Sequence, residues 1–130
     1  FTYRLGFDRP VLPALALGSD PALMALMSNS GQYDQHLLRH YRALSSSNHL
    51  LLMLSDGTNS GPLRVLRDEV LDNEQPVALL SVAGQNDSLC RDGVEICIGL
   101  ETGSVARQLE LVLFAGQLLC ELVESELFGV

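Results

Sequence analysis

The sequence predicts an α/β domain, a three-layer arrangement in which helices flank a parallel β-sheet, and three observations lead to this fold class. Short apolar runs of strand length alternate along the chain with longer stretches of helical periodicity. These runs are apolar at consecutive positions, which is typical of parallel strands buried on both faces. The chain has 130 residues, of which 47% are hydrophobic and 18% charged, so it can build one hydrophobic core and is not disordered.

The first part of the chain is predicted to contain one edge strand and two helices. Residues 11–17 form a short apolar run that includes Pro13, and a proline restricts a strand to the edge of a sheet. Helices are predicted over 22–27 and 34–44. The first helix follows Ser19-Asp20-Pro21, a capping residue and then a proline, which is a typical helix start.

The second part continues the alternation of strands and helices. Ser60 or Gly61 lies near the cap of a helix that has a proline in its first turn. Strands that alternate with helices imply right-handed βαβ crossovers and a parallel sheet. The predicted strands are 50–54, 77–82 and 94–98, and the predicted helices are 62–71 and 105–124.

The closing helix is apolar on nearly all sides, and such a helix must be buried on nearly all sides. We expect one face to meet the sheet and the other to meet another copy, so the chain is predicted to form a homo-oligomer, a dimer or a tetramer. The alternative is that a segment preceding Phe1 covers the second face. The first face consists of Val105, Leu109, Val112, Leu113, Gly116 and Leu119, and the second of Leu111, Phe114, Leu118 and Leu122.

The charge of the chain excludes several classes of function. Its net charge is −8, from 16 acidic and 8 basic residues, and every basic residue is an arginine. Without lysine the chain has neither a P-loop lysine nor a Schiff-base nucleophile. The negative charge disfavours contact with a phosphate backbone, so no direct nucleic-acid binding is predicted. No apolar run approaches the roughly 20 residues of a membrane span, so no membrane contact is predicted.

The cysteines predict a reducing environment. Cys90, Cys97 and Cys120 are too few and too unevenly spaced for a disulfide framework or a zinc site. Their apolar neighbours favour reduced, buried thiols, and a cytoplasmic location follows from that interpretation.

One loop combines several features of a phosphate site. Residues 55–60 lie between a predicted buried strand and the start of a helix, at the edge of the sheet where α/β proteins bind ligands. The loop offers hydroxyls, backbone N–H groups and the positive end of the helix dipole. Asp56 opposes an anion there, so the alternative is an ordinary turn with capping residues. The candidate phosphosugar-binding residues are Ser55, Thr58, Asn59 and Ser60.

The other chemically active side chains form no recognisable constellation. His36 and His40 have the spacing of two metal ligands on one helix, but no third ligand accompanies them, so we predict a solvated helix face and no metal site. His49 is predicted to lie at the surface. No base or nucleophile accompanies the carboxylates, so no catalytic residue and no cofactor are predicted. The carboxylates considered are Asp87, Asp92, Glu101 and Glu110.

Several segments of the chain match one family's pattern. The quoted segments are Arg9-Pro10-Val11-Leu12-Pro13-Ala14-Leu15-Ala16-Leu17, Arg42-Ala43-Leu44 with 50–55, Val94-Glu95-Ile96-Cys97-Ile98, and Ala106-Arg107 with Glu110. Through them almost the whole chain resembles the sugar isomerase (SIS) domain family, in its phosphoheptose isomerase branch. The resemblance implies a flavodoxin-like or Rossmann-like fold and a single SIS domain over residues 1–130. It also implies a fragment that lacks its N-terminal helices and first strand, because these would precede Phe1.

The candidate site departs from the family's pattern. The family's phosphate loop reads Ser-Thr-Ser-Gly-Asn-Ser, whereas here Asp56 and Gly57 replace hydroxyl residues. Active members carry a glutamine and a histidine on the closing helix at the positions of Leu109 and Gln117. Aldose–ketose isomerisation needs a base that moves a proton and an acid or metal that polarises the carbonyl, and neither side chain can supply these. The resemblance therefore implies a degenerate isomerase site.

Two functions follow from the resemblance. The ending 120–124, followed by Leu127 and Phe128, is similar to members of the branch that associate with the replication initiator DnaA. The preferred interpretation is therefore a non-catalytic oligomer that binds DnaA through Leu127 and Phe128 and promotes its assembly at the origin. The alternative is a phosphosugar-binding protein, or an isomerase, with a sugar phosphate such as sedoheptulose 7-phosphate as its ligand.

Overall fold

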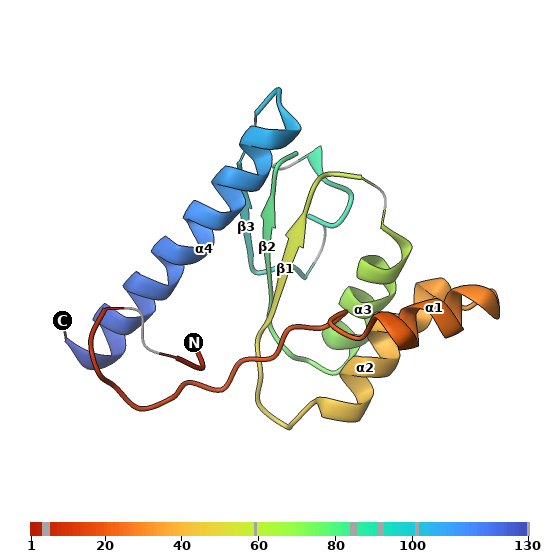
Figure 1. Ribbon diagram of the computed structural model, residues 1–130, viewed down its shortest axis with the longest axis horizontal. Coiled ribbons are helices and arrows are strands. Elements are labelled where there is room, and N and C mark those ends of the chain that lie inside the picture. Colours follow the sequence, from red (N-terminus) through yellow and green to blue (C-terminus); the bar gives the residue numbers. More distant parts are fainter. Residues whose placement is uncertain (4–5, 59, 84–85, 91–92, 101, 130) are drawn as a thin grey trace. The chain divides into compact units, whose positions relative to one another are not determined.

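The structure is a computed structural model that describes residues 1–3, 6–58, 60–83, 86–90, 93–100 and 102–129 (Figure 1). The chain divides into two compact units. The first, here called the sheet unit, is Leu17–Glu101. The second, here called the terminal unit, combines Phe1–Ala16 with Thr102–Val130.

The sheet unit confirms the predicted α/β fold class, because helices and parallel strands alternate along it. The helix predicted over 34–44 is divided into a short 3-10 helix and an α-helix. Residues 11–17 form no strand, contrary to the prediction, because Pro10 and Pro13 lack the N–H groups that a ladder requires. The elements are α1 (Pro21–Asn29), η1 (Tyr33–Gln35), α2 (His36–Leu44), β1 (Leu51–Ser55), α3 (Gly61–Asp72), β2 (Val77–Ser81) and β3 (Ile96–Gly99).

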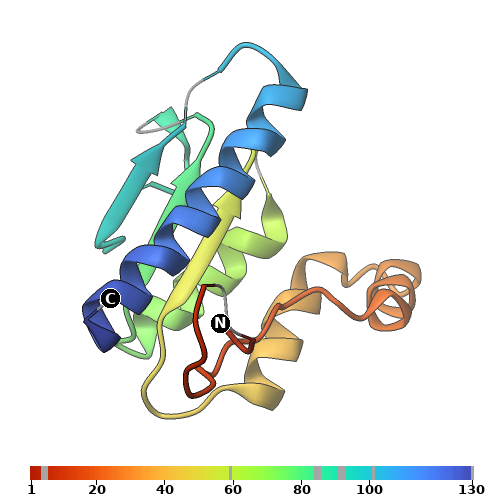
Figure 2. The same ribbon diagram turned by 60° about the vertical axis from the view of Figure 1, so that its left-hand side comes forward.

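The described strands form a parallel sheet in the order β1-β2-β3. Figure 2 shows them side by side, from yellow β1 to cyan β3. Leu51 pairs with Val77, and the register ends at Ser55 opposite Ser81. The register of β2 and β3 places Ser81 opposite Gly99. The carboxyl ends of all three strands therefore reach the same edge of the sheet.

One face of the sheet carries the hydrophobic core of the unit. Met53, Val77 and Leu79 point into this core from β1 and β2, and each is at most 2% exposed. Two helices and a loop complete it, because their amphipathic patterns turn apolar side chains toward the strands. These side chains are Leu38 and Tyr41 of α2, Leu66 and Val70 of α3, and Leu89.

The opposite face of the sheet is apolar as well, but on this face the side chains of the two outer strands are exposed. The register places side chains of β1, β2 and β3 in common rows on this face. Leu80 in the middle strand is buried, whereas the flanking strands expose large hydrophobic side chains. These are Leu52, Leu54, Ile96 and Ile98.

The starts of α1 and α3 follow the predicted capping pattern. The Asp20 side chain accepts the Leu23 N–H at the start of α1, at 3.0 Å. Ser60 is the N-cap of α3, and Pro62 occupies its first turn. These residues satisfy N–H groups that a helix start leaves without an intrahelical partner, which fixes where each helix begins.

The terminal unit is built on α4 (Val105–Phe128), which extends one turn beyond the predicted end and stops at Gly129, whose φ is 69°. The Arg9 Nε donates to Glu124 Oε1 at 2.6 Å, and the side chains of Arg9 and Glu124 are only 1% and 5% exposed. The Phe7 and Phe128 rings meet edge to face, 6.0 Å apart. A buried ion pair and an aromatic contact thus attach the N-terminal segment to the last turns of α4.

None of the helices in the described part of the chain is long and apolar enough to cross a bilayer.

Candidate functional site

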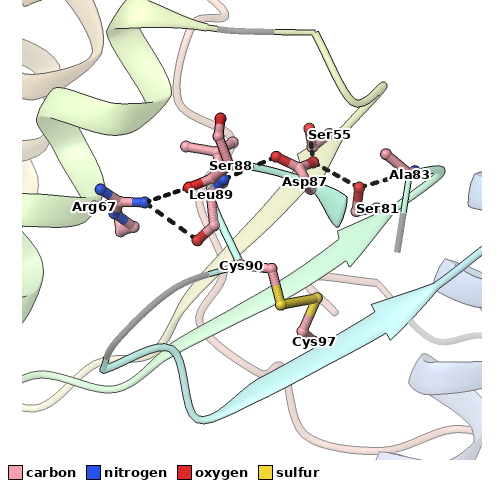
Figure 3. The surroundings of a disulfide bond; sticks show 9 residues. All are labelled: Ser55, Arg67, Ser81, Ala83, Asp87, Ser88, Leu89, Cys90 and Cys97. Atoms are coloured by element: carbon pink, nitrogen blue, oxygen red, sulfur yellow. Dashed lines mark hydrogen bonds between the residues drawn. A yellow bond between two sulfur atoms is a disulfide. The ribbon is translucent and has the colours of Figure 1, made fainter. Parts of the chain in front are cut away.

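The predicted phosphate loop lies where the sequence places it, between the end of β1 and the start of α3. Its first residue, Ser55, is only 4% exposed. The Ser55 Oγ donates to Asp87 Oδ2 at 2.6 Å (Figure 3). The same oxygen accepts the Gly57 N–H at 3.1 Å. The hydroxyl proton of Ser55 is therefore directed into the protein, beneath the loop.

The next strand ends in the same way. Ser81 Oγ donates to Asp87 Oδ2 at 2.5 Å and accepts the Ala83 N–H at 3.1 Å. Figure 3 shows both serines beside the one carboxylate. The Asp87 Oδ1 accepts the Leu89 N–H at 2.9 Å. Asp87 thus receives three hydrogen bonds while being only 2% exposed.

Asp87 is an ionised carboxylate by this geometry. Burial alone raises the pKa of a carboxyl group, because it disfavours the charged form. The hydrogen bonds from Ser55, Ser81 and the Leu89 N–H act in the opposite direction and prevail, so that the pKa of Asp87 lies below its ordinary value. Asp87 is one of the four carboxylates considered from the sequence, where no partner was predicted for it; its serine partners are 32 and 6 positions away.

The outer part of the loop is exposed and holds a second carboxylate. The Asp56 Oδ1 accepts the Thr58 N–H at 2.9 Å and the Thr58 hydroxyl at 2.6 Å. These bonds, the hydroxyl's first, lower the pKa of Asp56 below its ordinary value. Thr58 was predicted as a ligand-binding residue, and its two donors contact Asp56 in this structure.

Ser60 caps α3, and its Oγ accepts the Leu63 N–H at 3.4 Å. Asn59, predicted with it, lies outside the described residues. Gly61 follows at the first position of α3, where a Cβ would overlap with the Asp34 carboxylate of η1. The start of α3 therefore has an acidic side chain against its flank.

The segment after Asp87 is attached to two further elements. One Arg67 Nη of α3 donates to the carbonyls of Ser88 and Leu89, each at 3.2 Å. Cys90 forms a disulfide with Cys97 of β3, and Figure 3 shows this bond in the same view as Asp87 and its two serine partners.

The disulfide corrects the prediction of reduced thiols at Cys90 and Cys97. Their Cα atoms are 6.1 Å apart, within the usual reach of a disulfide, although the positions are 7 residues apart in sequence. Both residues are half-buried, and so is Cys120, the free cysteine among the described residues. An odd number of cysteines does not indicate whether two of them form a disulfide.

The histidines correct a second prediction, because they do not form a solvated helix face. His36 is 5% exposed, and its Nδ1 donates to the Tyr33 carbonyl at 2.6 Å. His40 has a buried Nδ1 without a hydrogen-bond partner among the described residues. His49 was predicted at the surface but is half-buried, and its Nε2 contacts the Tyr41 hydroxyl at 2.9 Å.

No group of three potential metal ligands occurs among the residues that the structure describes. Two of the acidic residues considered from the sequence, Asp92 and Glu101, lie outside them.

In the terminal unit, Leu109 is 70% exposed, and Gln117 is exposed on the same helix. Glu110 is also exposed and forms an ion pair with Arg107, three positions earlier. Leu127 and Phe128 belong to the last turn of α4 and are not a tail. Leu127 is 59% exposed, whereas Phe128 is half-buried.

The sequence comparisons find relatives among the phosphoheptose isomerases. The enzyme of Leptospira biflexa is 28% identical over 128 residues, which cover 98% of this chain and 65% of the relative. The enzyme of Thiobacillus denitrificans is 32% identical over 124 residues, covering 95% and 63%. No protein-family model matches the chain.

The structure comparisons agree with the sequence comparisons. A phosphoheptose isomerase of Francisella tularensis superposes with a TM-score of 0.69 at 22% identity, over 89% of this chain and 63% of that one. The phosphoheptose isomerase of Neisseria gonorrhoeae gives a TM-score of 0.66 at 19% identity, over 85% and 61%. In sequence the chain is similar to these phosphoheptose isomerases, and it shares the fold of the solved ones. It spans somewhat less than two thirds of the length of the first curated relatives that it matches.

Proposed function

We propose that the chain binds a sugar phosphate, in keeping with its similarity to phosphoheptose isomerases, and that the loop 55–60 receives the phosphate group. The observation that carries the proposal is the place of this loop. It joins the carboxyl end of a parallel strand to the N-terminus of α3, on a fold that solved phosphoheptose isomerases share. Ligands of open α/β sheets bind at this edge, and the start of a helix favours an anion.

The exposed part of the loop supplies the chemistry that the proposal needs. Thr58 has a hydroxyl and an N–H on the exposed side, both now directed to Asp56. A phosphate oxygen can accept the same two donors when the Asp56 side chain turns away. Ser55 has a different part in this proposal, because its buried hydroxyl shapes the loop through Asp87.

We propose binding of the sugar phosphate alone, without efficient isomerisation. Isomerisation through an enediol requires a base at one carbon and an acid or metal at the carbonyl. The resemblance assigns two of these roles to positions that Leu109 and Gln117 occupy here, and neither side chain titrates. We therefore expect affinity for a heptose phosphate without measurable isomerisation.

The names of the relatives favour this interpretation over the binding of DnaA, which was preferred from the sequence. The DnaA interpretation depends on Leu127 and Phe128. Phe128 has an intramolecular role as well, in its contact with Phe7. Binding of the initiator, and association into a homo-oligomer, stay predictions.

Titration calorimetry with sedoheptulose 7-phosphate, and with sedoheptulose as the unphosphorylated control, tests the proposal. We expect saturable binding of the phosphate ester alone. Thr58→Val, which removes the hydroxyl at nearly constant volume, should weaken it about tenfold, the loss of one charge-assisted hydrogen bond. Thr2→Val, at another exposed threonine, should leave it unchanged. Equal affinity for both sugars, or no binding, would overturn the proposal.

A further inference from the structure

The ends of β1 and β2 carry the same local arrangement twice. Ser55 and Ser81 are register partners in the sheet. Each serine oxygen accepts the N–H of the residue two positions later, at 3.1 Å in both cases. Each hydroxyl donates to the same oxygen, Asp87 Oδ2. One buried carboxylate therefore orients two consecutive strand-end turns.

The two turns also touch each other. Gly57 has a φ of 85°, a conformation that glycine adopts without strain. A Cβ on Gly57 would lie 2.7 Å from the Ala83 Cβ, so the backbone of one turn is in close contact with the other. A displacement of the Ser81 turn is therefore transmitted to Gly57.

We propose that Asp87 is a positioning residue for residues 55–58 of the loop, and that it couples the conformation of these residues to the end of the neighbouring strand. This inference rests on the proposed function for its effect on a ligand. Asp87 and Ser81 are 2% and 0% exposed, so neither can contact a ligand at the surface. They act through Ser55 and through Gly57.

The physical reason lies in the serine hydroxyl, which rotates freely unless its proton has an acceptor. The Ser55 hydroxyl donates its hydrogen bond to the Asp87 carboxylate, and this orientation leaves an oxygen lone pair toward the Gly57 N–H. Hydrogen bonds to an ionised acceptor are shorter and stronger than neutral ones, so the carboxylate selects one rotamer at each serine. Without it, the Gly57 N–H loses an oriented partner.

The coupling predicts an effect across strands. Ser81→Ala removes a hydroxyl from β2, yet it should accelerate hydrogen exchange at the Gly57 N–H, in the β1 loop, at least tenfold. It should also weaken the binding of sedoheptulose 7-phosphate by about threefold to tenfold. The reciprocal variant, Ser55→Ala, should accelerate exchange at the Ala83 N–H. Asp87→Asn should accelerate exchange at both amides.

Val77→Ala is the matched control, because Val77 lies on the same strand as Ser81 and is also 0% exposed. It lowers global stability through a cavity, but it leaves Gly57 exchange and ligand affinity unchanged if the coupling runs through the carboxylate. Equal acceleration at Gly57 in Val77→Ala and Ser81→Ala would overturn the proposal and make the effect one of general destabilisation. If Ser81→Ala does not fold, the Ser55→Ala and Asp87→Asn measurements decide.

The two proposals fail separately. Absence of binding in the unaltered chain, with the exchange effects present, removes the phosphosugar function and leaves the coupling. Binding that is present and unaffected by Ser81→Ala, with Gly57 exchange unchanged, removes the coupling and leaves the function.

Discussion

The charge of Asp56 should limit the affinity of the loop for a phosphate. The Asp56 carboxylate accepts both Thr58 donors, so it occupies the position that a phosphate oxygen would take. Its pKa is lowered, chiefly by the hydrogen bond from the Thr58 hydroxyl, so it is fully ionised at neutral pH. Asp56→Asn keeps an oxygen that can accept the Thr58 N–H and removes the charge. We expect this variant to bind sedoheptulose 7-phosphate more tightly.

The magnitude follows from the geometry. We take the separation of the two acceptors as about 5 Å, somewhat less than two hydrogen-bond lengths. At this distance in water, a carboxylate and a phosphate dianion repel by about 1.7 kcal/mol. Salt at physiological strength reduces that to about 1 kcal/mol, because the Debye length is about 8 Å. Affinity should therefore rise about fivefold, and the gain should be larger at low salt.

Calorimetric titration at two salt concentrations measures this effect. The matched control is Asp72→Asn, which removes the same charge from an exposed aspartate at the far end of α3. That variant should change affinity by less than twofold, since the charge lies about 15 Å or more from the loop by the length of the helix. Weaker binding by Asp56→Asn, or an equal gain in Asp72→Asn, would refute the reasoning.

Three further predictions concern stability and assembly. Gly116→Ala should raise the free energy of unfolding by about 1 kcal/mol, because nothing lies within 4 Å of the new methyl group. Gly61→Ala should raise it by less, because the new methyl group has to displace the exposed Asp34 side chain, and chemical denaturation compares the two variants. Reduction of the Cys90–Cys97 disulfide, which closes a loop of about eight residues, should lower stability by about 2.5 kcal/mol and Tm by roughly 10 °C in calorimetry, and an unchanged Tm would contradict this. Leu118→Glu, at a 42% exposed position of α4, should dissociate the predicted oligomer, and an unaltered sedimentation profile would exclude that helix face.

The fold class and the element order could be predicted because each element has a local signal. The continuous apolar run of β1 and the proline in the first turn of α3 are both visible within a few residues. Residues 11–17 could not be distinguished from a strand, because their apolar pattern is the same and the prolines decide only whether a partner strand can pair with them. The disulfide was missed for a similar reason, because the pairing of Cys90 with β3 depends on a loop whose path has no sequence signature.

The site shows the same division between local and non-local information. The loop after β1 was found from its composition, and the cap at Ser60 from its position before a proline. Asp87 was considered only as one of four carboxylates without a partner, because it acquires its partners only when two parallel strands are in register. One signal was nevertheless available: both strands end in a serine, as LLMLS and VALLS, a polar residue where each apolar run stops.

Two serines at equivalent strand ends bring two hydroxyls together at one edge, beneath any loop that binds a ligand there. Buried hydroxyl protons require an acceptor, and both Ser55 and Ser81 are at least 96% buried. An aspartate in the short loop after the second strand can accept both hydroxyl protons in hydrogen bonds, and Asp87 comes 6 residues after Ser81. When two paired parallel strands each end in a serine and an aspartate follows the second strand, we therefore expect the buried carboxylate to hold the loop after the first strand in place. Its test in this chain is whether Gly57 responds to a change at Ser81.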